Sequence, residues 1–149
     1  MVRTPPTVRP GEAVLQLADA HNRAVAGAKA AALARAHRAR MPVLPGFVLA
    51  PDAALAVAHG GADHIVSAAR VAWTELTQGG NRAVVVRSSS TVEDGVDSSM
   101  AGRFRSVLDV RGWDSFIEAV REVVTSGEAV RQGEPTGGVM AVLVQPFLE

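Results

Sequence analysis

The chain has 149 residues, of which 48% are apolar and 20% are charged, and fifteen basic residues balance fifteen acidic ones. This composition is that of one globular domain, and zero net charge gives no attraction for nucleic acid or an anionic membrane surface. The sequence has no apolar run long enough to span a bilayer, no secretory signal at its start and no cysteine for disulfides or thiolate sites. We therefore expect a cytoplasmic protein.

The first part of the chain is expected to contain a lead-in, two short strands and a helix. Residues 1–11 are rich in proline and should be extended, and the apolar stretch at 13–20 can form a short strand. Residues 27–39 are rich in alanine, the best helix former, and a helix there should stop before Pro42. The second short strand is expected at 45–51, between two prolines.

Two more helices are expected before the middle of the chain. The first should have Asp52 as its N-cap and end at Gly60. In the second, apolar residues recur at helical spacing from Ile65 to Leu76, and Gly79 follows. Both helices therefore have an apolar face to bury.

The second half should contribute three strands and one helix. Residues 83–86 are continuously apolar and rich in valine, which predicts a central strand buried on both faces. Side chains at 104–110 should alternate between two faces of a strand, and an amphipathic helix should begin at Trp113. A polar connector at 125–138 then leads to a last strand at 139–148. The order of elements predicts a mixed α/β, or α+β, domain in which helices pack on a small sheet.

Lys29 is the single lysine of the chain and lies in the first turn of the predicted helix. A cation there opposes the helix dipole at a cost of about 0.3–1 kcal/mol. A phosphate bound at the helix N-terminus would reverse that penalty. From its position alone, a side chain that extends into water is the simpler interpretation, and a phosphate ligand is the alternative.

Arg87 follows the valine-rich run, where an unpaired buried charge would cost several kcal/mol. Its planar guanidinium suits the oxygens of a phosphate, whereas an ion pair with Glu93, Asp94 or Asp97 is the structural alternative. The stretch 88–102 supplies hydroxyls and glycine N–H groups that could fold over a phosphate, although it lacks the Walker pattern.

The histidines and tryptophans are expected to have structural roles. The histidines lack metal-ligand spacing, so no metal site is predicted in this chain, and they should lie at the surface. The tryptophans lie on apolar faces and should belong to the core. These residues are His21, His37, His59, His64, Trp73 and Trp113.

Three motifs follow one another along the chain, namely GAKAAAL with MPVLPGFV, then VVVRSSSTVEDGVDSSMAGRF, and then VMAVLVQPFL. They are distributed over residues 22–148 and resemble the ATP-binding domain of the phosphoenolpyruvate synthase, pyruvate phosphate dikinase and rifampicin phosphotransferase family. In that family the first motif begins with Gly-Gly-Lys, the second reads V-R-S-S-A-T-x-E-D, and the third reads M-A-V-V-V-Q-x-M-V.

The resemblance implies an ATP-grasp-like fold in which ATP lies between two subdomains. It implies that Lys29 and Arg87 contact the phosphates of ATP, with Arg87 also acting in catalysis. It further implies that Gly102 and Ser106 line the nucleotide and that Gln145 lies beside the adenine. The stretch after Arg87 would then be a lid.

The family's activity implies a phosphotransferase in which ATP and Mg²⁺ phosphorylate a histidine on a swivelling domain, which passes the phosphate to an acceptor. Residues 12–149 correspond to the first ATP subdomain. The magnesium ligands are expected mostly in the second subdomain. That subdomain and the histidine domain would be supplied in the same protein or by another chain, so these 149 residues alone are expected to be inactive. Pyruvate, an antibiotic hydroxyl and a glucan are all compatible acceptors.

Several positions depart from the family pattern. Ala28 stands for the second glycine, Arg103 and Phe104 stand for paired glutamines, and the connector after the Trp113 helix is short. The alternative function is a stand-alone binding or regulatory module that keeps the fold and binds a partner protein. The sequence is also compatible with a homodimer in which a second copy covers the face that would otherwise contact the second subdomain. An exposed apolar patch on that face would favour a missing partner half, and a polar face would favour an independent module.

Overall fold

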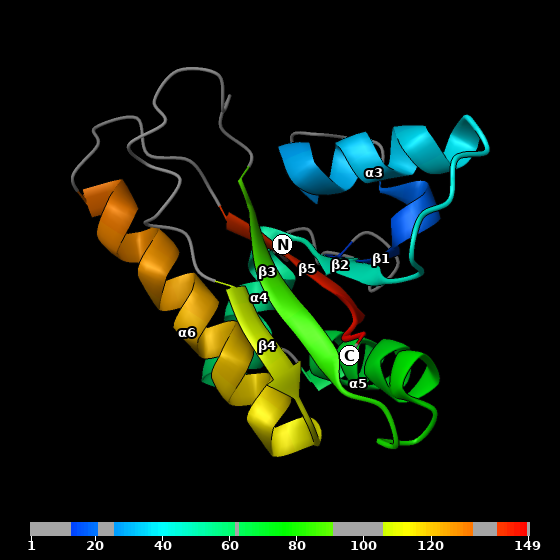
Figure 1. Ribbon diagram of the computed structural model, residues 1–149. Helices are drawn as coiled ribbons and strands as arrows, with labels where there is room; N and C mark the ends of the chain where they lie inside the picture. The colour runs from blue at the N-terminus through cyan, green and yellow to red at the C-terminus, as the bar shows by residue number, and fades with distance from the viewer. Residues whose placement is uncertain (1–12, 21–25, 62, 91–105, 133–139, 149) are drawn as a thin grey trace, which may run out of the picture.

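The protein is described by a computed structural model over residues 13–20, 26–61, 63–90, 106–132 and 140–148 (Figure 1). Within these ranges a five-stranded antiparallel sheet is surrounded by helices, which confirms the predicted α+β class. The predicted lead-in at 1–11 lies outside the described residues. The elements in chain order are β1 (Val14–Gln16), η1 (Leu17–Asp19), α3 (Ala28–Arg38), β2 (Phe47–Leu49), α4 (Pro51–His59), α5 (Asp63–Thr77), β3 (Val84–Ser90), β4 (Ser106–Val110), α6 (Trp113–Gln132) and β5 (Met140–Pro146).

The strand order in the sheet is β1-β2-β5-β3-β4, so β5 and β3 lie side by side inside it. β3 pairs with β5 over its whole length and with β4 on its other side, which confirms the valine-rich run as a central strand. Arg87 lies opposite Leu143 on β5 and opposite Ser106 on β4. Because directly opposite residues share a face, these three side chains belong to the same side of the sheet.

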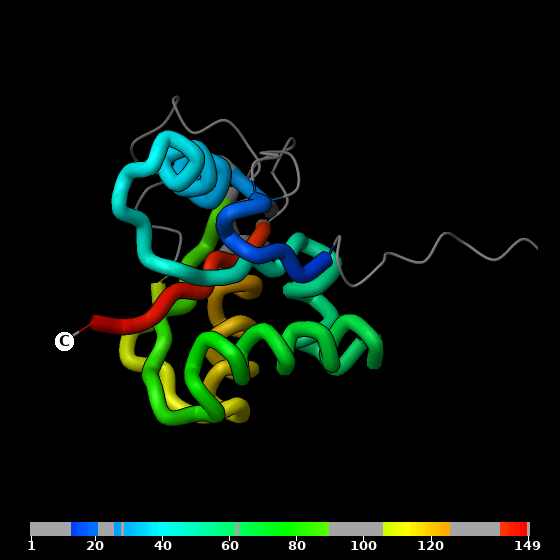
Figure 2. Tube along the Cα trace, turned by 90° about the vertical axis from the view of Figure 1, so that its right-hand side faces the viewer, coloured from blue at the N-terminus to red at the C-terminus, as the bar shows by residue number. Residues whose placement is uncertain are grey.

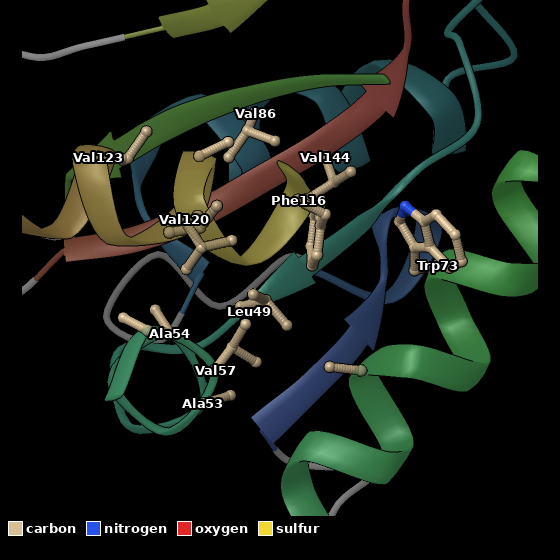
Figure 3. Close-up of a cluster of buried hydrophobic side chains, with 14 of the residues drawn as sticks. Leu49, Ala53, Ala54, Val57, Trp73, Val86, Phe116, Val120, Val123 and Val144 are labelled. Carbon is tan, nitrogen blue, oxygen red and sulfur yellow. The ribbon is translucent and has the colours of Figure 1, made fainter. Parts of the chain in front are cut away.

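The two faces of the sheet are covered differently. The larger core contains Val84 and Val86 of β3 and is formed with α4, α5 and α6, as Figure 3 shows for part of it. On the other face, which we call the α3 face, α3 packs over Leu143 and Ala141 of β5 and Val48 of β2. Figure 2 shows α3 on one side of β2 and β5, with α5 and α6 on the opposite side. The side-chain period of two along β3 therefore places Val85, Arg87 and Ser89 on the α3 face. The residues of β3, β4 and β5 on this face are Val85, Arg87, Ser89, Ser106, Ala141, Leu143 and Gln145.

Aromatic rings fill the larger core where α5 and α6 approach the sheet. The ring of Phe116 lies 6.1 Å from that of Phe47 and 5.3 Å from that of Trp113, and Trp113 lies 5.5 Å from Trp73. Trp73 is buried, as predicted, whereas Trp113 is only half-buried, beneath the guanidinium of Arg70. The rings therefore connect the core to the surface of α5.

Three histidines are exposed as predicted, namely His37, His59 and His64, and His21 lies outside the described residues. Across the described ranges, no helix combines the length and the apolar character needed to cross a membrane.

Two predicted boundaries were wrong. Ala50 is the N-cap of α4 and Pro51 opens the helix, so Asp52 lies within the first turn and does not cap it. Proline suits that first position because its φ is already helical and its missing N–H would have no partner there. α6 continues to Gln132, through the first part of the predicted polar connector. Glutamate, alanine, arginine and glutamine favour helix, and extension of an existing helix needs no new nucleation.

The predicted alternation along β4 is interrupted by a bulge. Val107 lies opposite Val86 and Val110 lies opposite Val84, so three steps on β4 match two on β3. Asp109 absorbs the extra residue with a φ of 54°, and Asp109 and Leu108 are both exposed. Val107 and Val110 thus both face the larger core, which strict alternation does not allow.

Candidate functional site

The start of α3 lies against the end of β3, and the side chain of Ser89 joins them. Ser89 Oγ accepts a hydrogen bond from the N–H of Ala30 (3.2 Å) and donates one to the carbonyl of Ala26 (2.7 Å). The N–H of Ala30 belongs to the first helical turn, whose N–H groups have no partner within the helix. Ser89 therefore acts as a helix cap supplied from a strand 59 residues away.

Gly27 allows this close approach. It is the N-cap of α3, with φ 87° and ψ 164°, a conformation that essentially only glycine adopts. A Cβ at this position would collide with the backbone carbonyl and the hydroxyl of Ser89. The next residue, Ala28, is already helical, so the departure from Gly-Gly-Lys falls where alanine suits the backbone. Lys29 follows in the first turn, and its side chain is exposed.

Arg87 lies two residues before Ser89, on the same face of β3, about 7 Å away along the strand. Its side chain is half-buried, and no described residue forms a hydrogen bond or an ion pair with it. The alternative partners Glu93, Asp94 and Asp97 lie outside the described residues. The junction at Ser89 therefore ties the segment that carries Lys29 to the strand that carries Arg87, 58 positions away in sequence, at one corner of the α3 face.

Two further predicted residues belong to this face. Ser106 is exposed and lies directly opposite Arg87. Gln145 is 7% exposed and lies opposite Val85, two cross-strand pairs beyond the Arg87–Leu143 pair on the side away from Ser89. Its Nε2 donates to the carbonyl of Leu44 at 3.3 Å, which orients the amide group.

Gly46 permits the approach of the β2 chain to β5 near Gln145, because a Cβ there would collide with the carbonyl of Val144.

Of the predicted site residues, Arg87, Ser106 and Gln145 lie on the α3 face of the sheet and Lys29 lies on α3 itself, whereas Gly102 lies outside the described residues. Along β3 and β5, Arg87 therefore lies between the Ser89 junction and the cross-strand pair that contains Gln145.

The predicted lid was wrong at its beginning. β3 extends through Ser90, and the side chains of Ser88 and Ser89 are buried, so these two hydroxyls are not available to a ligand. A buried serine is stable when its hydroxyl is hydrogen-bonded, as that of Ser89 is. The rest of the predicted lid lies outside the described residues. The role of Ser89 was missed because three serines after an apolar run resemble the start of a loop.

A concave region lies between β4 and α6, and none of the predicted site residues lines it. This groove has a volume of about 800 Å³ and includes Asp109, Arg111, Glu118 and Glu122. Arg111 pairs with Asp109 at 2.9 Å, and both side chains are exposed. In the described parts of the chain, no three histidine or acidic side chains are grouped so that they could hold a metal ion.

Comparison with known proteins gives two matches. Residues 60–131 match the family described as pyruvate phosphate dikinase, AMP/ATP-binding domain. A 58-residue segment is 47% identical to phosphoenolpyruvate synthase of Pseudomonas aeruginosa (strain UCBPP-PA14), and it covers 38% of this chain and 7% of that protein. The family match includes Arg87, Gly102 and Ser106, whereas Lys29 and Gln145 lie beyond its ends. Together the two matches support an N-terminal ATP-binding domain similar to that of the pyruvate phosphate dikinase and phosphoenolpyruvate synthase family, which is the family that the three motifs resemble.

Proposed function

We propose that this chain is the ATP-binding part of a phosphoenolpyruvate-synthase-like phosphotransferase and that it holds the phosphates of ATP at the corner between α3 and β3. The observation that supports the proposal is the Ser89 junction, which ties the segment that carries Lys29 to the strand that carries Arg87. The family match supports the nucleotide as ligand. We assign Ser106 to the lining of the same corner and Gln145 to the base end of the nucleotide.

The chemistry of the corner suits a triphosphate. The guanidinium of Arg87 offers a planar set of donors for two phosphate oxygens, and the ammonium of Lys29 adds a compact charge. Phosphoryl transfer needs mainly positioning and compensation of negative charge, which these two groups can provide. Arg87 is the group we expect to stabilise the transferring phosphoryl oxygens.

The remaining parts of the reaction are assigned to other domains. In an ATP-grasp arrangement a second subdomain would close over the α3 face, and its carboxylates would hold Mg²⁺. The described residues contain no suitable metal cluster, so no step in this chain is assigned to the ion. A histidine on a further domain, in the same protein or in another chain, would receive the phosphate and carry it to the acceptor.

Calorimetric titration with Mg-ATP tests the proposal. We expect the unmodified chain to bind and Arg87→Ala to weaken binding by about 10- to 100-fold, the usual range for loss of a charge-assisted contact. Arg82→Ala is the matched control, because Arg82 is an exposed arginine just before the other end of β3 and should not affect affinity. Equal affinity of the Arg87→Ala and unmodified proteins, or no binding up to millimolar Mg-ATP, would contradict the proposal.

A further inference from the structure

We infer that Ser89 is a positioning residue for the phosphate site: its buried hydroxyl fixes the first turn of α3, and with it Lys29, relative to Arg87. The inference rests on the proposed function, and it assigns to Ser89 no contact with the nucleotide. Its side chain is 1% exposed, and its hydroxyl already donates to Ala26 and accepts from Ala30. Because the Ser89 hydroxyl is buried and already bonded, it affects a bound nucleotide by fixing the positions of α3 and β3.

The two hydrogen bonds of Ser89 lie on either side of the segment that carries the lysine. Ala26 precedes the N-cap of α3 and Ala30 is its third residue, so Gly27, Ala28 and Lys29 lie between the two anchored groups. Both ends of this short segment are therefore tied to one atom. Movement of Lys29 away from β3 requires that at least one of these bonds breaks.

Apolar packing fixes the position of α3 less closely than the two hydrogen bonds of Ser89 do. Four of the seven buried residues in the core beneath α3 are alanines, namely Ala20, Ala26, Ala30 and Ala141. Burial of such surfaces favours contact but is non-directional, whereas hydrogen bonds have preferred distances and angles. The two bonds of Ser89 are therefore the contacts that set the rotation and axial position of α3 relative to β3.

Arg87 does not depend on Ser89 in this way. It lies within β3 between two hydrogen-bonded neighbours, β5 and β4, which hold its backbone on both sides. Loss of the Ser89 hydroxyl should therefore displace Lys29 and leave Arg87 in place. This asymmetry distinguishes a positioning role from a general contribution to stability.

A double-mutant cycle tests the inference. Affinity for Mg-ATP is measured by calorimetry for Ser89→Ala alone, with Lys29→Ala and with Arg87→Ala. We expect Ser89→Ala to weaken binding about tenfold in the unmodified and Arg87→Ala proteins, and by less than about twofold in Lys29→Ala, where the group it positions is already absent. Ser88→Ala is the matched control, because Ser88 is a buried serine on the opposite face of the same strand and should not change the affinity.

Amide hydrogen exchange without nucleotide gives a second readout. Ser89→Ala should speed exchange in the first turn of α3, at Ala30 above all, and leave Arg87 in β3 protected. Unchanged exchange at Ala30, or an equal loss of affinity in the Lys29→Ala background, would overturn the inference while the proposed function stands. If the unmodified protein fails to bind Mg-ATP, the proposed function fails and the inference fails with it.

Discussion

Gly27→Ala should lower the free energy of unfolding by about 3 kcal/mol, from backbone strain and overpacking together. The residue has φ 87° and ψ 164°, which disfavours any side chain. Its new Cβ would also meet the backbone of Ser89. That backbone cannot retreat easily, because β3 is paired on both sides. We therefore expect α3 to separate from β3 and affinity for Mg-ATP to fall as well.

Urea unfolding measures this loss, and Gly60→Ala is its matched control. Gly60 also has a positive φ, 72°, but a Cβ there would have no neighbour within 4 Å. Its replacement should therefore cost only the conformational strain, about 1 kcal/mol. If Gly27→Ala cost no more than Gly60→Ala, the close approach of α3 to β3 would not be a requirement of the fold.

Phe116→Ala is expected to destabilise the protein by about 3–5 kcal/mol, the usual cost of deleting a fully buried aromatic ring. Phe116 is fully buried on α6, where its ring stacks on Trp113 and lies 6.1 Å from Phe47. Helix, sheet and the neighbouring aromatic ring would all lose contacts around the cavity. Since domains of this size are stable by about 5–15 kcal/mol, the variant should unfold at much lower denaturant concentration.

Tryptophan fluorescence during urea unfolding checks this prediction, because Trp113 reports directly on the Phe116 site. Leu108→Ala provides the comparison with a large apolar residue at the surface. Leu108 is 58% exposed, so its loss should change stability by no more than about 0.5 kcal/mol. Similar midpoints for the two variants would show that Phe116 is not a central element of the core.

The elements of the fold could be predicted where the composition of a short segment determines its structure. The alanine-rich segment before Pro42 became α3, and the valines at 84–86 became part of the central strand β3. The sequence pattern was insufficient where the pairing between strands decides the structure. The bulge at Asp109 depends on which residues of β3 lie opposite β4, and alternation within one strand does not contain that information. At Asp52, a good capping residue was overridden by the proline before it.

The residues of the candidate site were proposed from the sequence, but the contacts that join their elements could not be predicted from it. Lys29 and Arg87 were chosen for their chemistry and from the three motifs, and the structure places their elements together. What joins those elements is a pair of hydrogen bonds from Ser89, made across 59 and 63 residues. A serine in a run of serines carries no local sign that it will be buried and will cap a distant helix. The sequence alone therefore predicts the groups at the corner but not how they are held together.

The central place of β5 has a consequence for how the chain folds during synthesis. Val144 on β5 lies between Phe47 on β2 and Val86 on β3, and within the described sheet β5 alone joins the β1–β2 pair to the β3–β4 pair. The ribosome makes β5 after the other four strands, so the growing chain holds two unjoined halves with their apolar faces open. We expect the core to close only once residues 140–146 have left the exit tunnel, and chaperones have their best opportunity to bind in the interval before that.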